Sequence, residues 1–189
     1  MKSISWGHWD PKADACITDC GGEGKPLWLA PIQSPLTLAI IRGMDLPKVC
    51  ETDPPAGNLV LDQMVNEVAQ QIESAISNGA QGIAYVLNGA FPEQTTPMQY
   101  GGLFLERDRE LLALAMDLKF NLIFVEGNSE VYLDTVSDLP AHAFGWRIQA
   151  TGFTPKMMSA NRPGPYASFD GLGDIALLPS SNGGNEVAA

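Results

Sequence analysis

The stretch that decides the fold is FNLIFVEGNSEVYLDTVSDLPAHAFGWR, residues 120–147. The apolar run at 121–125 predicts a buried strand, and residues 129–138 predict a short helix. A second apolar run at 141–145 predicts another strand, which ends in aromatic and polar side chains. A strand, a helix and a strand in this order predict a β-α-β unit with parallel strands.

Outward from this segment the same alternation continues along the chain. We expect further strands at 27–32, 82–87 and 164–169, and helices at 34–42, 58–78 and 105–118. The proline-containing stretches 45–57 and 88–102 are predicted to be loops. The fold class predicted is α/β, either a partial TIM-like barrel or an open parallel sheet of about five β-α units. A closed eight-stranded barrel would need roughly 250 residues.

The domain organisation expected has three parts. Residues 1–26 are rich in Gly, Asp and Trp without clear periodicity and predict an irregular N-terminal arm. Residues 27–178 form the β/α partial-barrel domain, and residues 179–189, with Ser, Gly and Asn, predict a flexible tail.

Composition excludes several functions. Among 189 residues, 22 acids against 11 bases leave a net charge of −11, and no Lys/Arg cluster is present to bind nucleic acid or an anionic membrane. We expect a cytoplasmic protein, because neither a secretory signal nor a membrane-spanning apolar run is seen.

Three cysteines do not make a disulfide framework, and His8, Cys16 and Cys20 lack a second metal-binding pair, so no metal is predicted. Without G-x-G-x-x-G or Walker spacing, no nucleotide cofactor is predicted.

The candidate site residues follow the predicted strands. Parallel α/β folds place chemistry at the carboxyl ends of their strands, and Glu126 stands at such an end, where a partly desolvated carboxylate can act as a general base. The alternative is a solvated loop acid. Trp146 and Arg147 could hold a flat, acidic ligand, or could cap the core and pair with an acid. Asn88 and Tyr100, in the long loop, are predicted to bind substrate.

Two other groups of polar residues are predicted to be structural. His142 lies near the start of a predicted strand, which is the end of a barrel that serves stability. The charge run at 106–110 opens a helix, where acids suit the helix dipole, and predicts a solvated helix face.

Four segments together resemble the uroporphyrinogen decarboxylase superfamily. They are the strand and helix start APIQSPLTLA at 30–39, the helix-to-strand turn SNGAQGI at 77–83, the helical segment from Tyr100 to Leu111, and the strand pair IFVEG at 123–127 with 141–146. The resemblance covers about residues 28–172. It implies a barrel fold and either tetrapyrrole decarboxylation, a lyase reaction, or cobalamin-related methyl transfer.

The chain departs from the family pattern at several positions. It lacks the family's usual N-terminal part and its late Gly-His-Gly, has Ile41 at the family's tyrosine and Asn88 at its serine, and carries Phe124 and Glu126 where the methyltransferases hold zinc. A degenerate active site is therefore the alternative: a non-catalytic binding or assembly subunit that completes its barrel by oligomerisation, such as a homodimer. The partners expected are a tetrapyrrole-like small molecule and further copies of the chain.

Overall fold

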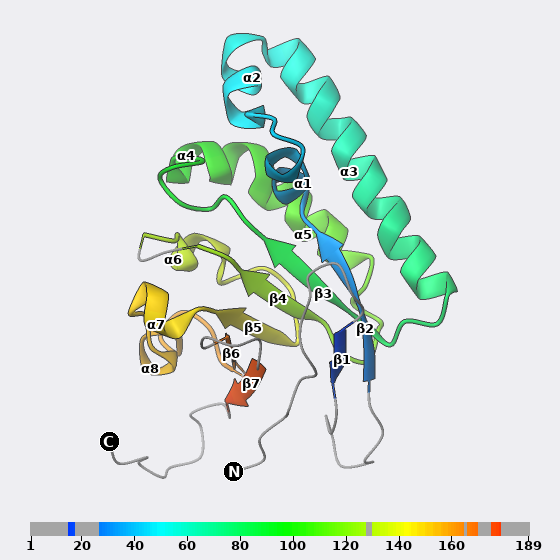
Figure 1. The fold of residues 1–189 in the computed structure, drawn as a ribbon, viewed down its shortest axis with the longest axis vertical. Helices are drawn as coiled ribbons and strands as arrows, with labels where there is room; N and C mark the ends of the chain where they lie inside the picture. Colours follow the sequence, from blue (N-terminus) through cyan, green and yellow to red (C-terminus); the bar gives the residue numbers. More distant parts are fainter. Residues whose placement is uncertain (1–14, 18–26, 128–129, 165, 170–174, 179–189) are drawn as a thin grey trace.

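The structure, a computed structural model, describes residues 15–17, 27–127, 130–164, 166–169 and 175–178. Its strands form one seven-stranded sheet whose spatial order is the order of the chain (Figure 1). The strands are β1 (Ala15–Ile17), β2 (Leu27–Gln33), β3 (Gly82–Leu87), β4 (Leu122–Val125), β5 (Ala143–Trp146), β6 (Tyr166–Phe169) and β7 (Ile175–Leu178).

Helices occupy most of the connections between the parallel strands. They are α1 (Pro35–Ile41), α2 (Leu46–Thr52), α3 (Pro54–Ser77), α4 (Pro97–Tyr100), the π-helical η1 (Gly101–Leu105), α5 (Glu106–Ala113), α6 (Leu133–Val136), α7 (Ile148–Thr151) and α8 (Pro155–Met158).

The sheet is parallel in its middle and antiparallel at both edges. Strands β2 to β6 pair in parallel with their chain neighbours, while β1 and β7 pair antiparallel with β2 and β6. The predicted α/β class is confirmed. Among the described strands β2 and β6 do not meet, so this is an open sheet.

The core lies between the sheet and its helices. Alternate residues of β3, namely Ile83, Tyr85 and Leu87, share one apolar cluster with residues of α3 and α5. The intervening side chains of β3 are also buried. A strand covered on both faces needs apolar residues at every position, which is why a continuous apolar run predicted these strands.

The predicted loop at 45–57 is wrong, because its prolines start helices rather than interrupt them. Asp45 caps α2 by accepting from the backbone N–H of Lys48, and Asp53 caps α3 in the same way. In both helices a proline occupies the first turn, where its missing N–H would have no helical partner. Asp followed within two residues by Pro was the signal for a helix start.

The second predicted loop, 88–102, also contains a helix start. Thr96 and Gln99 form a capping box, in which the Thr96 hydroxyl accepts from the Gln99 backbone and the Gln99 side chain accepts from the Thr96 backbone. The helix therefore begins at Pro97, continues through η1 and ends at Ala113. The helix predicted at 105–118 is real in its first part, while 114–117 form turns.

The short elements were the hardest to predict. The helix expected at 129–138 is reduced to α6 in the described residues, and neither β1 nor β7 was expected. Strands of three or four residues are too short to show periodicity. The rest of the arm at 1–26, and the tail at 179–189, lie outside the described residues.

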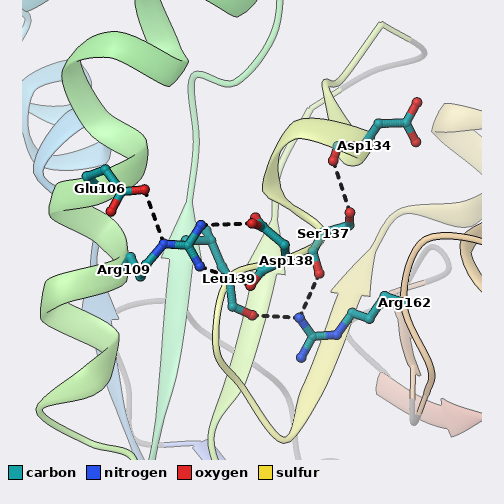
Figure 2. A network of polar contacts seen from close by, with 7 residues as sticks. All are labelled: Glu106, Arg109, Asp134, Ser137, Asp138, Leu139 and Arg162. Carbon is teal, nitrogen blue, oxygen red and sulfur yellow. Dashed lines mark hydrogen bonds and ion pairs between the residues drawn. The ribbon is translucent and has the colours of Figure 1, made fainter.

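Two arginines hold the connection between α6 and β5 from opposite sides (Figure 2). From α5, Arg109 pairs with Asp138 at 2.8 Å and with Glu106 at 3.2 Å. From beyond α8, Arg162 donates to the backbone carbonyls of Ser137, Leu139 and Ala141 at 2.6 to 2.8 Å. Its guanidinium also lies 5.3 Å from the centre of the Phe144 ring.

Burial makes the Arg162 contacts matter more than the surface ion pairs. Desolvation lowers the pKa of the Arg162 guanidinium, and carbonyl dipoles replace the water that it loses. The loop 137–141 thus receives three hydrogen bonds from a single side chain, which sets the start of β5.

We expect Arg162→Met to lower the free energy of unfolding by about 3 kcal/mol, because half-buried carbonyls lose a charged donor. Chemical denaturation measures this. Arg42→Met is the matched control: Arg42 pairs with Glu67 on the exposed surface, and such pairs contribute little. Equal losses in both variants would show that Arg162 is an ordinary surface residue.

Candidate strand-end site

Three polar side chains meet at the carboxyl edge of the sheet. Leu87 pairs with Val125, and Val125 pairs with Trp146, so the next residues of the three strands come out side by side. Those residues are Asn88, Glu126 and Arg147. We call Asn88, Glu126 and Arg147 the strand-end group.

The group is held together by the Glu126 carboxylate. Asn88 Nδ2 donates to Glu126 Oε2 at 3.3 Å, and a guanidinium nitrogen of Arg147 lies 3.9 Å from Oε1. Both contacts are long. Among the described residues the guanidinium makes no closer polar contact, and its other neighbour is the Phe124 ring, with the ring centre 6.0 Å away. Within the described part of the chain, Arg147 therefore has donors left for a ligand.

Burial makes the Glu126 carboxyl more basic than usual. Its side chain is 27% exposed, against 45% for Arg147. Desolvation raises the pKa of Glu126, and the positive charge of Arg147 partly offsets this by lowering it. The group thus combines a carboxyl that holds its proton to higher pH with an accessible cation.

The backbone turns sharply after two of these strands. Gly89 and Gly127 follow Asn88 and Glu126, with φ of +108° and +150°. Residues other than glycine rarely adopt such φ values, and a Cβ at Gly127 would lie 1.9 Å from a methyl carbon of Val131. A polar residue followed by glycine at these two strand ends is the sequence signal for this site.

Two hydroxyls near the group carry no functional signal in the sequence. Ser34 caps α1, and Thr37 Oγ1 accepts from the backbone N–H of Asn88 at 2.8 Å. Both side chains are buried. The Ser-Pro-x-Thr pattern marks a helix start, but nothing in it shows that the threonine reaches the next strand.

The other two predicted substrate-binding residues, Tyr100 and Trp146, do not join the strand-end group. Trp146 is fully buried in the core, where its Nε1 donates to the Phe153 carbonyl at 2.7 Å and its ring packs against Tyr166. Of the two alternatives for Trp146 and Arg147, the structure therefore gives Trp146 a place in the core. Arg147 lies at the surface beside Glu126.

Tyr100 belongs to a buried polar cluster with Tyr85 and Asp108. Both phenol hydroxyls donate to the Asp108 carboxylate, one to each oxygen, at 2.6 Å. Burial raises the pKa of Asp108 to about 6, although both hydrogen bonds favour the charged form. The pKa values of the two phenols are raised well above 10, first by burial and then by the carboxylate.

The prediction of a solvated face at 106–110 is wrong for Asp108, which is 1% exposed. Helical spacing explains this. Asp108 lies four residues after Phe104 and three and four before Leu111 and Leu112, all of them buried. An acid on an apolar helix face was the available signal.

His142 has the structural environment that its position predicts. Its Nδ1 accepts from the backbone N–H of Asn121 at 2.9 Å, and its ring stacks on Phe120. It lies at the opposite edge of the sheet from the strand-end group, before β5 begins.

The described residues contain no group of three or more His, Cys, Asp or Glu arranged to hold a metal ion. His8 and Cys20, which have the side chains of zinc ligands, lie outside the described residues, as does the side chain of Cys16. None of the helices in the described part of the chain has the length and apolar content needed to cross a bilayer.

Comparison with known proteins adds no identification: no family model matches the chain, and neither does any curated protein.

The Asp108 cluster predicts a pH effect on stability. A carboxyl whose pKa is raised on folding contributes stability below its unfolded pKa, near 3.8, and loses it as pH rises through about 6. Asp108→Asn removes this titration. Between pH 4 and pH 7 we expect the variant to gain up to about 3 kcal/mol relative to the unmodified protein, measured by urea denaturation. A difference that stays constant over this range would contradict the prediction.

The strand-end group predicts that Arg147 controls the protonation of Glu126. In Arg147→Ala the pKa of Glu126 should rise, because the cation that lowers it is gone. The ¹³C shift of the Glu126 carboxyl, followed by NMR against pH, measures this. Arg109→Ala is the control, since Arg109 pairs with Glu106 and Asp138 instead. An equal rise in both variants would point to overall charge rather than proximity.

Proposed function

We propose that this chain is a uroporphyrinogen decarboxylase-like protein that binds a carboxylate-bearing tetrapyrrole at its strand-end group. The family assignment rests on the sequence resemblance. The observation that supports the site is the half-buried Glu126 carboxyl beside the accessible Arg147 guanidinium. Five parallel strands in chain order are also the arrangement of a stretch of a β/α barrel, whose sites lie at the carboxyl ends of strands.

Arg147 is the residue for the ligand carboxylate. A guanidinium presents paired N–H donors that match the two oxygens of a carboxylate. The ion pair to Glu126 is long, at 3.9 Å, so a ligand carboxylate can approach the guanidinium without breaking a close hydrogen bond. A net charge of −11 makes a placed cation necessary for any acidic ligand.

Glu126 is the candidate proton donor and acceptor. In a decarboxylation the bond to the carboxylate carbon breaks, carbon dioxide leaves, and the remaining carbon takes up a proton. A carboxyl with a raised pKa can supply that proton closer to neutral pH than a solvated acid can. Asn88 steadies the carboxylate through its 3.3 Å hydrogen bond.

Methyl transfer is the less supported activity within the same family. The methyltransferase relatives hold zinc where this chain has Phe124 and Glu126, and a phenylalanine supplies no ligand atom. We therefore propose the lyase activity rather than the transferase activity, in a cytoplasmic protein.

Absorbance titration with uroporphyrin tests the binding, and anaerobic incubation with uroporphyrinogen, followed by chromatography of the products, tests the reaction. We expect Arg147→Ala to weaken uroporphyrin binding roughly tenfold to a hundredfold, the effect of losing a charge-assisted hydrogen bond. Glu126→Gln should retain binding and lose turnover.

Arg107→Ala is the charge-matched control, because Arg107 is on α5 and pairs with Asp62 on the surface. The proposal fails if the unmodified protein binds no porphyrin, or if the Arg107 and Arg147 variants lose affinity equally.

A second candidate is a binding or assembly subunit that associates with copies of itself. The open sheet favours it, because the parallel strands do not close on themselves. Among the described strands its edges are β1 and β7, and each of them pairs with another strand on one side only. A second copy would cover the other side of such an edge. Sedimentation of the full chain distinguishes a monomer, which would exclude this candidate, from a dimer.

A further inference from the structure

The Thr37 hydroxyl joins helix α1 to the end of β3, a strand that lies far from it in the sequence. It donates to the Val86 carbonyl at 3.1 Å and accepts from the Asn88 backbone N–H at 2.8 Å. A third contact, at 2.7 Å, joins it to the Ser34 hydroxyl. Thr37 lies on α1 and is 2% exposed.

The hydrogen positions in this cluster follow from counting. A hydroxyl has one hydrogen and can accept twice. Because the Thr37 hydrogen goes to Val86, the Ser34 hydroxyl is the donor in the contact between them. Thr37 Oγ1 therefore makes three hydrogen bonds, and its capacity is filled.

Capping of α1 does not require this hydroxyl. Ser34 already caps the helix by accepting from the Thr37 backbone N–H, and the Ser34 N–H itself donates to the Val86 carbonyl at 2.9 Å. What the Thr37 side chain adds is an acceptor for Asn88 N–H. Asn88 is half-buried, and its N–H left without a partner would cost about 1 kcal/mol, the lower end of the range for buried groups.

The backbone position of Asn88 determines whether its side chain reaches the Glu126 carboxylate. Asn88 is followed by Gly89 in a left-handed turn, so its backbone has no regular helix or strand partner on that side. The hydrogen bond to Thr37 holds the backbone there, and the side chain then reaches the Glu126 carboxylate.

We propose that Thr37 is a positioning residue of the strand-end site: its hydroxyl holds the Asn88 backbone so that the Asn88 amide hydrogen-bonds the Glu126 carboxylate. The role of these two hydrogen bonds in activity rests on the function proposed above. The hydrogen bonds themselves are a property of the unliganded protein. Helix α1 follows β2, whereas Glu126 follows β4, two strands further along the sheet. Through Thr37 the helix thereby sets the hydrogen bonding of the Glu126 carboxyl.

The experiment compares Thr37→Val with Thr37→Ser in the full chain without ligand. Valine keeps the shape and removes the hydroxyl, whereas serine keeps the hydroxyl. We expect the ¹³C titration of the Glu126 carboxyl to move to higher pH in the valine variant, because the carboxylate loses a stabilising donor. Amide hydrogen exchange at Asn88 should become faster. The serine variant should behave as the unmodified protein in both measurements.

Ser137→Ala is the control for general loss of stability. It removes a buried hydroxyl that donates to the Asp134 carbonyl, far from the strand ends, and should leave the Glu126 titration unchanged. If Thr37→Val does not fold, Asn88→Ala tests the last link, since it keeps the backbone contact and removes the amide donor.

An unchanged Glu126 titration in folded Thr37→Val or in Asn88→Ala overturns the proposal, as does a serine variant that behaves like valine. These measurements need no porphyrin. If the protein does not bind uroporphyrin but shows the expected titrations, the positioning role of Thr37 is supported and the proposed function is contradicted.

Discussion

The parallel register of β3, β4 and β5 is the constraint on which the rest of this structure depends. Leu87, Val125 and Trp146 stand in one row across the three strands. Each strand is covered on both faces, so a slip by one residue would exchange the two sets of apolar side chains. The row is therefore fixed by packing. The three polar residues that follow it meet as a consequence.

Buried or half-buried polar groups connect this sheet to neighbouring segments at both ends of its strands. At the carboxyl edge, Thr37 joins α1 to the end of β3. At the amino ends of the strands, Arg162 holds the loop before β5 through hydrogen bonds to three backbone carbonyls. Between them, Asp108 connects α5 to β3 through Tyr85. Each group makes two or three hydrogen bonds inside the protein, which offset the water that it loses.

Much of the fold could be predicted, because its main elements carry local signals. The buried strands are continuous apolar runs, and α3 repeats apolar residues at helical spacing. The failures were also local. Prolines after Asp45 and Asp53 predict loops when they are read as helix breakers, although proline in the first turn of a helix is favourable. Elements of three or four residues, such as β1 and β7, carry no periodic signal at all.

The candidate site was predictable only in part. Asn88, Glu126 and Arg147 each follow a strand, and the sequence alone determined that a polar residue would stand at each of these ends. Only the tertiary structure decided that Tyr100 turns inward to Asp108, that Trp146 fills the core, and that Thr37 reaches Asn88. The physical reason is that periodicity reports which face of an element is apolar. Which side chains meet across that face depends on the register and packing of segments distant in the chain.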